Sequence, residues 1–238
     1  MKYLSALLLS LFLIGCSAMK IAVNQQFWEN NQADRIGIIF TKQPQPYAYK
    51  LGSQGLLDIA INNLMASTLQ KHLEEIDISG FQAVKDTFKT HFEEKGFHNI
   101  IFLNDTLNEK QLKTFSEGGK KFADKDFRNF KQKYNIDFLI VISIAKYGTA
   151  REYYGFIPLG APSGLFEANG MMVDLNNNKY IWYREMSDNE SIKKVEGDWD
   201  QAPDYPNLTK AIMGAMNSAK KFLSDNFFYN VDKPEVTQ

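Results

Sequence analysis

The feature that most constrains the fold is an apolar run at residues 138–145, Phe-Leu-Ile-Val-Ile-Ser-Ile-Ala, which is rich in β-branched side chains. Such side chains favour strands, and a continuous run without alternation suits a strand that is covered on both faces. A strand of this kind needs a layer of structure on each side of its sheet. The run therefore predicts a central strand in a layered domain.

Hydrophobic periodicity predicts the elements around this strand. Apolar residues three or four positions apart indicate helices, and short β-branched or alternating runs indicate strands. The predicted helices cover residues 56–73, 81–95 and 126–134, with a last one from Pro206, and further strands cover residues 35–40, 99–103, 167–175 and 179–186. Prolines and glycines predict a loop at residues 44–55. The fold class expected from this order is a single α/β domain with helices packed on a mixed, mainly central β-sheet.

The N-terminus has the composition of a cleaved signal peptide. Lys2 supplies a positive charge, and residues 4–14 are almost entirely apolar. This run is shorter than the ~20 apolar residues that a membrane-spanning helix needs. It ends in Leu-Ile-Gly-Cys at Cys16, which resembles the lipobox of bacterial lipoprotein precursors. The alternative is a plain cleaved signal whose apolar run ends near a cysteine.

The resemblance to lipoprotein precursors implies cleavage before Cys16 and attachment of lipid, palmitate included, to this cysteine. Two or more acyl chains anchor a protein stably in a membrane. Ser17 follows, rather than the aspartate that retains many such lipoproteins in the inner membrane. The implied location is therefore the cell envelope, at the outer membrane and facing the periplasm.

These observations divide the chain into four parts. We expect a signal peptide at residues 1–15, a lipidated tether at 16–34, the α/β periplasmic domain at 35–230 and a flexible tail at 231–238. A hydrophobic fraction of 44% supports a real core. The formal net charge of −1, with no basic block, argues against nucleic acid as a partner. With its only cysteine lipidated, the domain forms no disulfide.

Two short stretches carry a second resemblance. Tyr134-Asn-Ile-Asp137 precedes the central strand, and Asp174-Leu175 is followed by Trp182 beyond a turn. This pattern resembles a periplasmic α/β family that includes the amino-terminal domain of TolB, the curli secretion lipoprotein and the lipoprotein activators of penicillin-binding proteins. The chain departs from that family at Asn178-Lys179, where a turn glycine is usual. The resemblance implies a protein that binds or assembles rather than an enzyme, and it transfers no site residues.

One segment resembles a metal site. Asp174, Asn176, Asn178 and Glu185 match positions 1, 3, 5 and 12 of a calcium-binding loop. However, Lys179 stands where that loop needs glycine, and the flanking residues indicate strands rather than helices. The segment therefore predicts a β-hairpin turn, and no metal or other cofactor is expected there.

A metal-dependent enzyme is the weakest functional alternative. His91 and Glu94 share one face of a predicted helix, His98 follows after a glycine, and His72 is the remaining histidine. Imidazole and carboxylate groups can bind metal, but a packed or surface histidine is the commoner case. The sequence contains neither a serine-hydrolase elbow nor a glycine-rich phosphate loop. We therefore expect no enzymatic activity and no catalytic residues.

The candidate binding site is an apolar loop at residues 153–166. Its two prolines and three glycines predict irregular structure, and apolar surface loops often mark interaction sites. Its candidate contact residues are Tyr153, Tyr154, Phe156, Ile157, Leu159, Leu165 and Phe166. Alternatively, the loop folds down as a lid over the edge of the sheet.

Together these features predict a lipid-anchored envelope lipoprotein that acts as a protein-binding or assembly module. The expected partners are the membrane, through the lipid on Cys16, and an envelope protein, through the loop. A homo-oligomer formed through the same loop is a further alternative. So is a structural envelope protein whose loop contacts the membrane.

Overall fold

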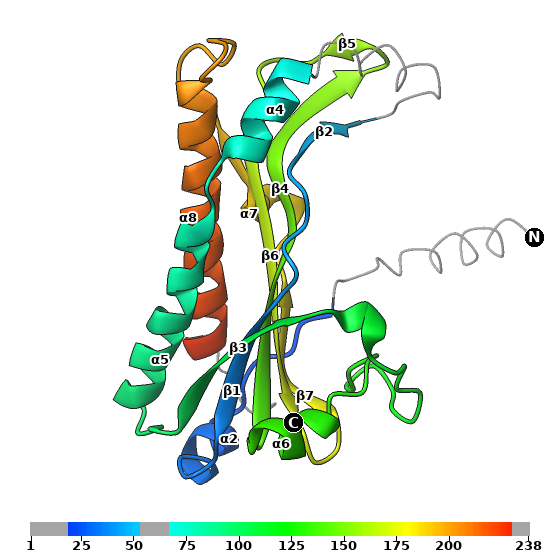
Figure 1. Cartoon of the computed structure of the whole chain (residues 1–238), viewed down its shortest axis with the longest axis vertical. Coiled ribbons are helices and arrows are strands. Elements are labelled where there is room, and N and C mark those ends of the chain that lie inside the picture. The colour runs from blue at the N-terminus through cyan, green and yellow to red at the C-terminus, as the bar shows by residue number, and fades with distance from the viewer. Residues whose placement is uncertain (1–18, 53–66, 230–238) are drawn as a thin grey trace, which may run out of the picture.

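The structure is a computed structural model that describes residues 19–52 and 67–229. Figure 1 shows its elements. The helices are α2 (Gln25–Asn30), α4 (Ser67–Glu75), α5 (Val84–Glu94), α6 (Asn129–Tyr134), α7 (Asp188–Ser191) and α8 (Pro206–Phe228), with the 3₁₀ turns η2 (Ser79–Ala83) and η3 (Glu109–Gln111). The strands are β1 (Ile36–Thr41), β2 (Tyr47–Leu51), β3 (Ile100–Leu107), β4 (Phe138–Tyr154), β5 (Ile157–Pro158), β6 (Ser163–Asp174), β7 (Lys179–Glu185) and β8 (Ile192–Lys194).

The long strands β4 and β6 form the centre of one mixed sheet. The strand order is β3-β1-β4-β6-β7, and β2 and β5 add to β4 while β8 adds to β6. β1 and β2 run parallel to β4, whereas β6 is antiparallel to it. β1 pairs with the first part of β4 and β2 with its last part, because Ile36 lies opposite Phe138 and Tyr47 opposite Gly148. The predicted single α/β domain with helices on a mixed sheet is confirmed.

Side chains alternate along the first part of β4, so that its two faces enter different cores. Phe138, Ile140 and Ile142 pack in a core that contains aromatic residues of α2, α5 and α8. Leu139 and Val141 pack in a second core with residues of segment 107–130. Figure 1 shows α5 and α8 on one side of the sheet and this segment on the other. The prediction of a central strand covered on both faces is therefore confirmed for this part of β4.

The last helix, α8, begins at Pro206 as predicted, since proline suits the first turn of a helix. It lies very close to β6. A Cβ atom on Gly164 would lie only 2.3 Å from the main-chain carbonyl carbon of Ala211. On the same strand, a Cβ atom on Gly170 would lie 2.2 Å from the indole ring of Trp182. These two glycines allow the helix and the indole ring to approach the sheet.

The described part of the predicted tether, from Met19 onward, packs against the domain. Ile21 forms a β-bridge with Tyr183, and the Asn24 side chain caps α2 by accepting a hydrogen bond from the Phe27 N–H at 2.8 Å. Phe27 and Trp28 of that helix are buried in the first core. The folded domain therefore begins well before the expected boundary at residue 35.

Several predicted boundaries differ from the structure. β2 occupies part of the predicted loop at residues 44–55, and β3 continues to Leu107, beyond its predicted end. The predicted helix at 56–73 is described only from Ser67, where α4 begins. Its residues 56–66 lie outside the described part of the chain. So do the predicted signal peptide, Cys16 and the tail at residues 231–238.

Within residues 19–52 and 67–229, no helix has both the length and the hydropathy that crossing a membrane requires.

Candidate functional site

The candidate binding loop is in large part a β-hairpin. β4 continues to Tyr154, where Tyr153 pairs with Pro158 and Tyr154 with Ile157 of β5. Gly155 stands first in the two-residue turn and has φ = 59°, which is the position and the sign of φ that a type II′ turn requires of glycine. The prediction of irregular structure throughout residues 153–166 was therefore wrong. Strand pairing with β5 and β6 overrides the local signals of the prolines and glycines.

Four exposed apolar side chains lie on this hairpin, and a fifth lies on a neighbouring strand. Exposed fractions are 73% for Tyr154, 62% for Phe156, 58% for Ile157, 54% for Leu159 and 52% for Tyr47 of the neighbouring β2. Among the described residues, the one other large hydrophobic side chain with comparable exposure is that of Tyr229, at the C-terminal end of α8. We call Tyr154, Phe156, Ile157 and Leu159 the apolar tip, which lies at the β5 end of the molecule in Figure 1. Tyr47 lies opposite Gly148 of β4, six residues before Tyr154, and is not part of the tip.

Three of the predicted contact residues do not belong to this surface. Leu165 and Phe166 lie within β6 and are buried, and the Phe166 ring packs 4.9 Å from that of Phe81 in the first core. Tyr153 is half-buried beneath the hairpin. Including Leu165 and Phe166 among exposed contact residues was an error, because β6 starts at Ser163 and carries both into the core. The alternative of a lid does not fit the exposure of Tyr154, Phe156, Ile157 and Leu159.

Hydrogen bonds and a cation–π contact hold the base of the hairpin. The Arg151 guanidinium donates to the Gly160 carbonyl at 2.7 Å, and the Leu159 N–H donates to the Glu152 carbonyl at 2.8 Å. Arg151 also lies 4.7 Å from the ring centroid of Trp199, in the loop before α8. The tip is therefore presented on a hairpin with fixed ends rather than on a free loop.

The calcium-like segment is a hairpin turn between β6 and β7, as predicted. The side chain of Asn178 is buried and faces segment 123–127, where it donates to the carbonyls of Ala123 and Lys125 and accepts from the Phe127 N–H. The Asp174 carboxylate accepts from Asn176 and Asn177. These side chains stabilise the turn and connect it to the covering segment.

The three histidines have separate surroundings and do not form one cluster. His91 Nδ1 lies 2.9 Å from a Glu94 carboxylate oxygen, and His72 Nε2 lies 2.7 Å from the Thr209 hydroxyl. His98 is exposed. Within the described residues, no group of three or more histidine, cysteine, aspartate or glutamate side chains is placed to bind a metal ion. The expectation that the protein needs no metal stays a prediction.

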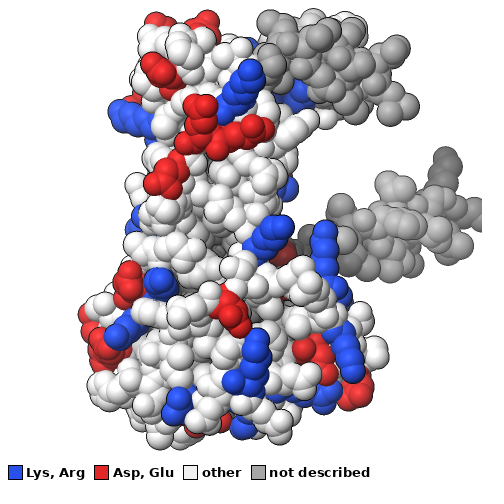
Figure 2. Space-filling view, in the orientation of Figure 1, with Lys and Arg blue, Asp and Glu red and all other residues white. Residues whose placement is uncertain are grey.

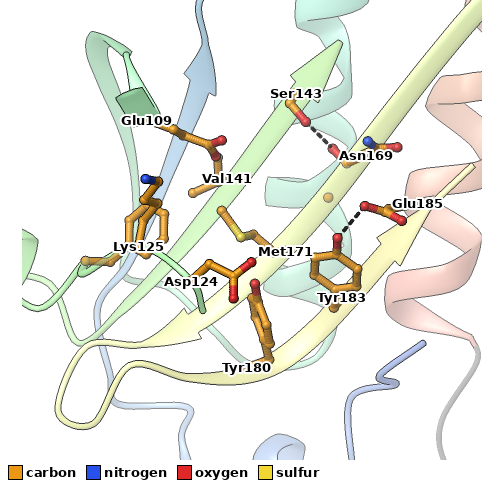
Figure 3. A pocket seen from close by; sticks show the side chains of 12 residues that line it. Glu109, Asp124, Lys125, Val141, Ser143, Asn169, Met171, Tyr180, Tyr183 and Glu185 are labelled. Carbon is orange, nitrogen blue, oxygen red and sulfur yellow. Dashed lines mark hydrogen bonds between the residues drawn. The ribbon is translucent and has the colours of Figure 1, made fainter. Parts of the chain in front are cut away.

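Sequence reasoning missed a polar cavity on the face of the sheet opposite α8 (Figure 3). The cavity has a volume of about 250 Å³ and lies between β4, β6, β7 and the segment from Glu109 to Phe127. Its polar lining includes Glu109, Asp124, Asn169, Tyr180, Tyr183 and Glu185. The sequence carries no clear signal for this cavity, because Asn169 and Glu185 lie on strands that contain other polar residues, such as Glu167 and Arg184.

The cavity raises the pKa of both of its phenols above the ordinary value for tyrosine. Burial raises the pKa of Tyr180 to about 12. Burial also raises the pKa of Tyr183, and so does the hydrogen bond that its hydroxyl donates to Glu185. The pKa of the Glu109 carboxyl is raised by burial as well. The cavity thus offers hydroxyl, amide and carboxylate groups that can form hydrogen bonds with a small polar molecule.

Comparisons with known proteins give no family. No protein-family model and no curated protein matches the chain. Weakly similar solved structures include the hypothetical protein CT253 from Chlamydia trachomatis, with 8% identity, a TM-score of 0.33 and coverage of 80% of this chain and 96% of that one. The PelC dodecamer from Paraburkholderia phytofirmans has 7% identity and a TM-score of 0.28, and the match covers 85% of this chain and 95% of that one. The lipoprotein GNA1162 from Neisseria meningitidis has 11% identity and a TM-score of 0.26, and the match covers 76% of this chain and 98% of that one. Similarity at these TM-scores supports no conclusion about this chain.

Proposed function

We propose that this protein is a lipid-anchored envelope lipoprotein that acts as a protein-binding or assembly module, with the apolar tip as its contact surface. The observation that carries the proposal is the presence of four exposed apolar side chains on the one hairpin that β4 and β5 form. Contiguous apolar patches on the surface of a domain mark interaction sites. The anchor rests on the lipobox-like sequence that ends at Cys16. An outer-membrane location facing the periplasm is part of the same proposal.

The construction of the tip suits recognition of a protein. Tyrosine and phenylalanine are enriched at the centres of protein interfaces, and the tip contains Tyr154 and Phe156. The hairpin is already ordered by pairing of β5 with β4, so little conformational entropy is lost when a partner binds. The proposed activity is therefore binding, with no catalytic step and no cofactor.

The proposed function does not include binding to nucleic acid. The visible face in Figure 2 is mostly uncharged, and positive and negative side chains are interspersed on it. A nucleic-acid-binding surface would instead show an extended basic stripe.

The test is capture of a partner from detergent-solubilised envelopes by the immobilised mature protein. Replacing Phe156, Ile157 and Leu159 together by serine removes the apolar side chains that the partner would bury, so we expect capture to fall by more than ~100-fold. These side chains are exposed, so the midpoint of thermal unfolding should change by no more than about 2 °C.

The matched control is Tyr229→Ser, which removes an equally exposed aromatic ring at the other end of the molecule and should leave capture unchanged. Equal capture by wild type and the triple-serine variant would contradict the proposal. If the wild type floats with protein-free vesicles when it carries no lipid, and the triple variant does not, the tip contacts membrane instead. If the immobilised protein captures only further copies of itself, the tip forms a homo-oligomer.

A further inference from the structure

The folded domain begins three residues after the proposed lipid anchor. Met19 and Ile21 pack against the second core, and Ile21 exchanges two main-chain hydrogen bonds of 3.0 Å with Tyr183 of β7. The position of residue 19 on the domain surface is therefore fixed by the fold. Whatever conformation residues 16–18 adopt, an extended chain reaches at most ~3.6 Å per residue, or about 11 Å from Cys16 to Met19.

This short reach determines which surface lies near the bilayer. If Cys16 carries lipid, the part of the domain around Met19 lies within about 11 Å of the membrane surface. That distance is comparable to the Debye length of about 8 Å at physiological ionic strength. Charges around Met19 are therefore close enough to interact with lipid headgroups.

Four exposed lysines surround this point and come from three separate segments of the chain. They are Lys20, Lys120, Lys121 and Lys179. Phe122 forms a β-bridge with Lys179, and the Lys121 carbonyl accepts from the Tyr180 N–H at 2.9 Å, so the fold holds segment 120–122 beside the start of β7. Lys20 lines one surface hollow with Lys120 and an adjoining one with Lys121 and Lys179. Figure 2 shows basic side chains beside the place where the grey N-terminal residues leave the domain.

These lysines carry positive charge that the described part of the protein does not neutralise by contact. None of the four lies within 4.0 Å of a carboxylate oxygen among the described residues, although six other lysines there form such pairs. Acidic groups around them are Asp124, which lines the first hollow, Asp174, which lies opposite Lys179 in the pairing of β6 with β7, and Glu190, which interacts with Lys20 at longer range. Positive charge therefore exceeds negative charge at this surface.

We propose that Lys20, Lys120, Lys121 and Lys179 form a basic patch that binds the anionic headgroups of the membrane in which the protein is anchored. This inference rests on the proposed lipidation of Cys16. A lipid chain combined with a basic patch holds a protein more firmly than either signal alone. The patch also fixes the orientation of the domain, because it presses the Met19 side against the bilayer.

The test attaches the mature protein to vesicles and maps which lysines the membrane covers. Cys16 is the only cysteine, so a maleimide-bearing lipid couples the chain at the proposed anchor without any cellular lipidation. Lysines are then acetylated on vesicles of phosphatidylcholine with and without phosphatidylglycerol, and modification is read by mass spectrometry. We expect the four patch lysines to react about fivefold more slowly on the anionic vesicles, whereas exposed Lys71 and Lys210 react equally on both.

Salt and substitution complete the test. Raising ionic strength until the Debye length falls to ~3 Å should remove the protection. Unlipidated protein in which all four patch lysines are replaced by glutamine should lose its co-sedimentation with phosphatidylglycerol vesicles. Equal acetylation of the patch on both kinds of vesicle would overturn the proposal. Labelling of cells with an alkyne fatty acid, comparing wild type with Cys16→Ser, tests the anchor separately, so that failure of the anchor is distinguishable from failure of the patch.

Discussion

Replacing Gly164 by alanine is expected to destabilise the protein by about 3 kcal/mol or more. The added Cβ atom would lie 2.3 Å from the carbonyl carbon and 2.6 Å from the carbonyl oxygen of Ala211. These are main-chain atoms in the second turn of α8, so rotation of a side chain cannot relieve the overlap. The helix would have to move away from β6, and it would then lose the packing of Leu208 and Ile212, which are buried.

Equilibrium unfolding in denaturant measures this effect, and Gly119→Ala is its matched control. A Cβ atom on Gly119 would meet no atom within 4 Å, so that variant should stay within about 0.5 kcal/mol of wild type. Comparable stability of the two variants would show that the helix does not lie against the strand as described.

Replacing Asn178 by glycine is expected to cost about 3 kcal/mol. The side chain is buried and makes three hydrogen bonds of 2.8 to 3.0 Å to the main chain of segment 123–127. Without it, the carbonyls of Ala123 and Lys125 and the N–H of Phe127 lose their partner in a buried environment. Asn178 has φ = 66°, and glycine keeps this backbone conformation without strain, so the measured loss reports the hydrogen bonds.

The control for this substitution is Asn177→Gly in the same turn. Asn177 is exposed, and its side-chain bonds to Asp174 and Lys179 compete with water. We expect it to cost less than about 1 kcal/mol. A loss at Asn178 no larger than that at Asn177 would mean that the network does not hold the covering segment to the sheet.

The sequence predicted the central strand well because its apolar side chains are contiguous. Burial on both faces leaves no alternation, and residues 138–142 show this directly. The second half of β4 was missed because Lys146, Gly148 and Arg151 interrupt the apolar pattern. There the strand is maintained by pairing with β2 and β6, which a local reading of the sequence does not detect.

β2 was missed for a related reason. Tyr47-Ala-Tyr-Lys-Leu51 has strand composition, but Pro46 and Gly52 flank it closely and indicate a loop. Proline before a strand and glycine after it mark the ends of a short edge strand as well as they mark a loop. Only the partner strand distinguishes the two.

The candidate site could be predicted in part. An apolar segment with tyrosine, phenylalanine and isoleucine at a turn was visible in the sequence, and Tyr154, Phe156, Ile157 and Leu159 are exposed. The polar cavity and the basic patch could not be predicted, because they combine segments far apart in the chain and depend on the register of β6 and β7.

The most direct test of the central claim is photocrosslinking in intact cells from a photoreactive amino acid placed at Phe156, with the same amino acid at Tyr229 as control. Both side chains are exposed, at 62% and 63%, but only Phe156 belongs to the apolar tip. The account predicts one discrete protein adduct from position 156 that is absent from position 229. The account would be contradicted if position 156 gave adducts only to lipid or only to other copies of the protein. It would also be contradicted if both positions gave the same adducts.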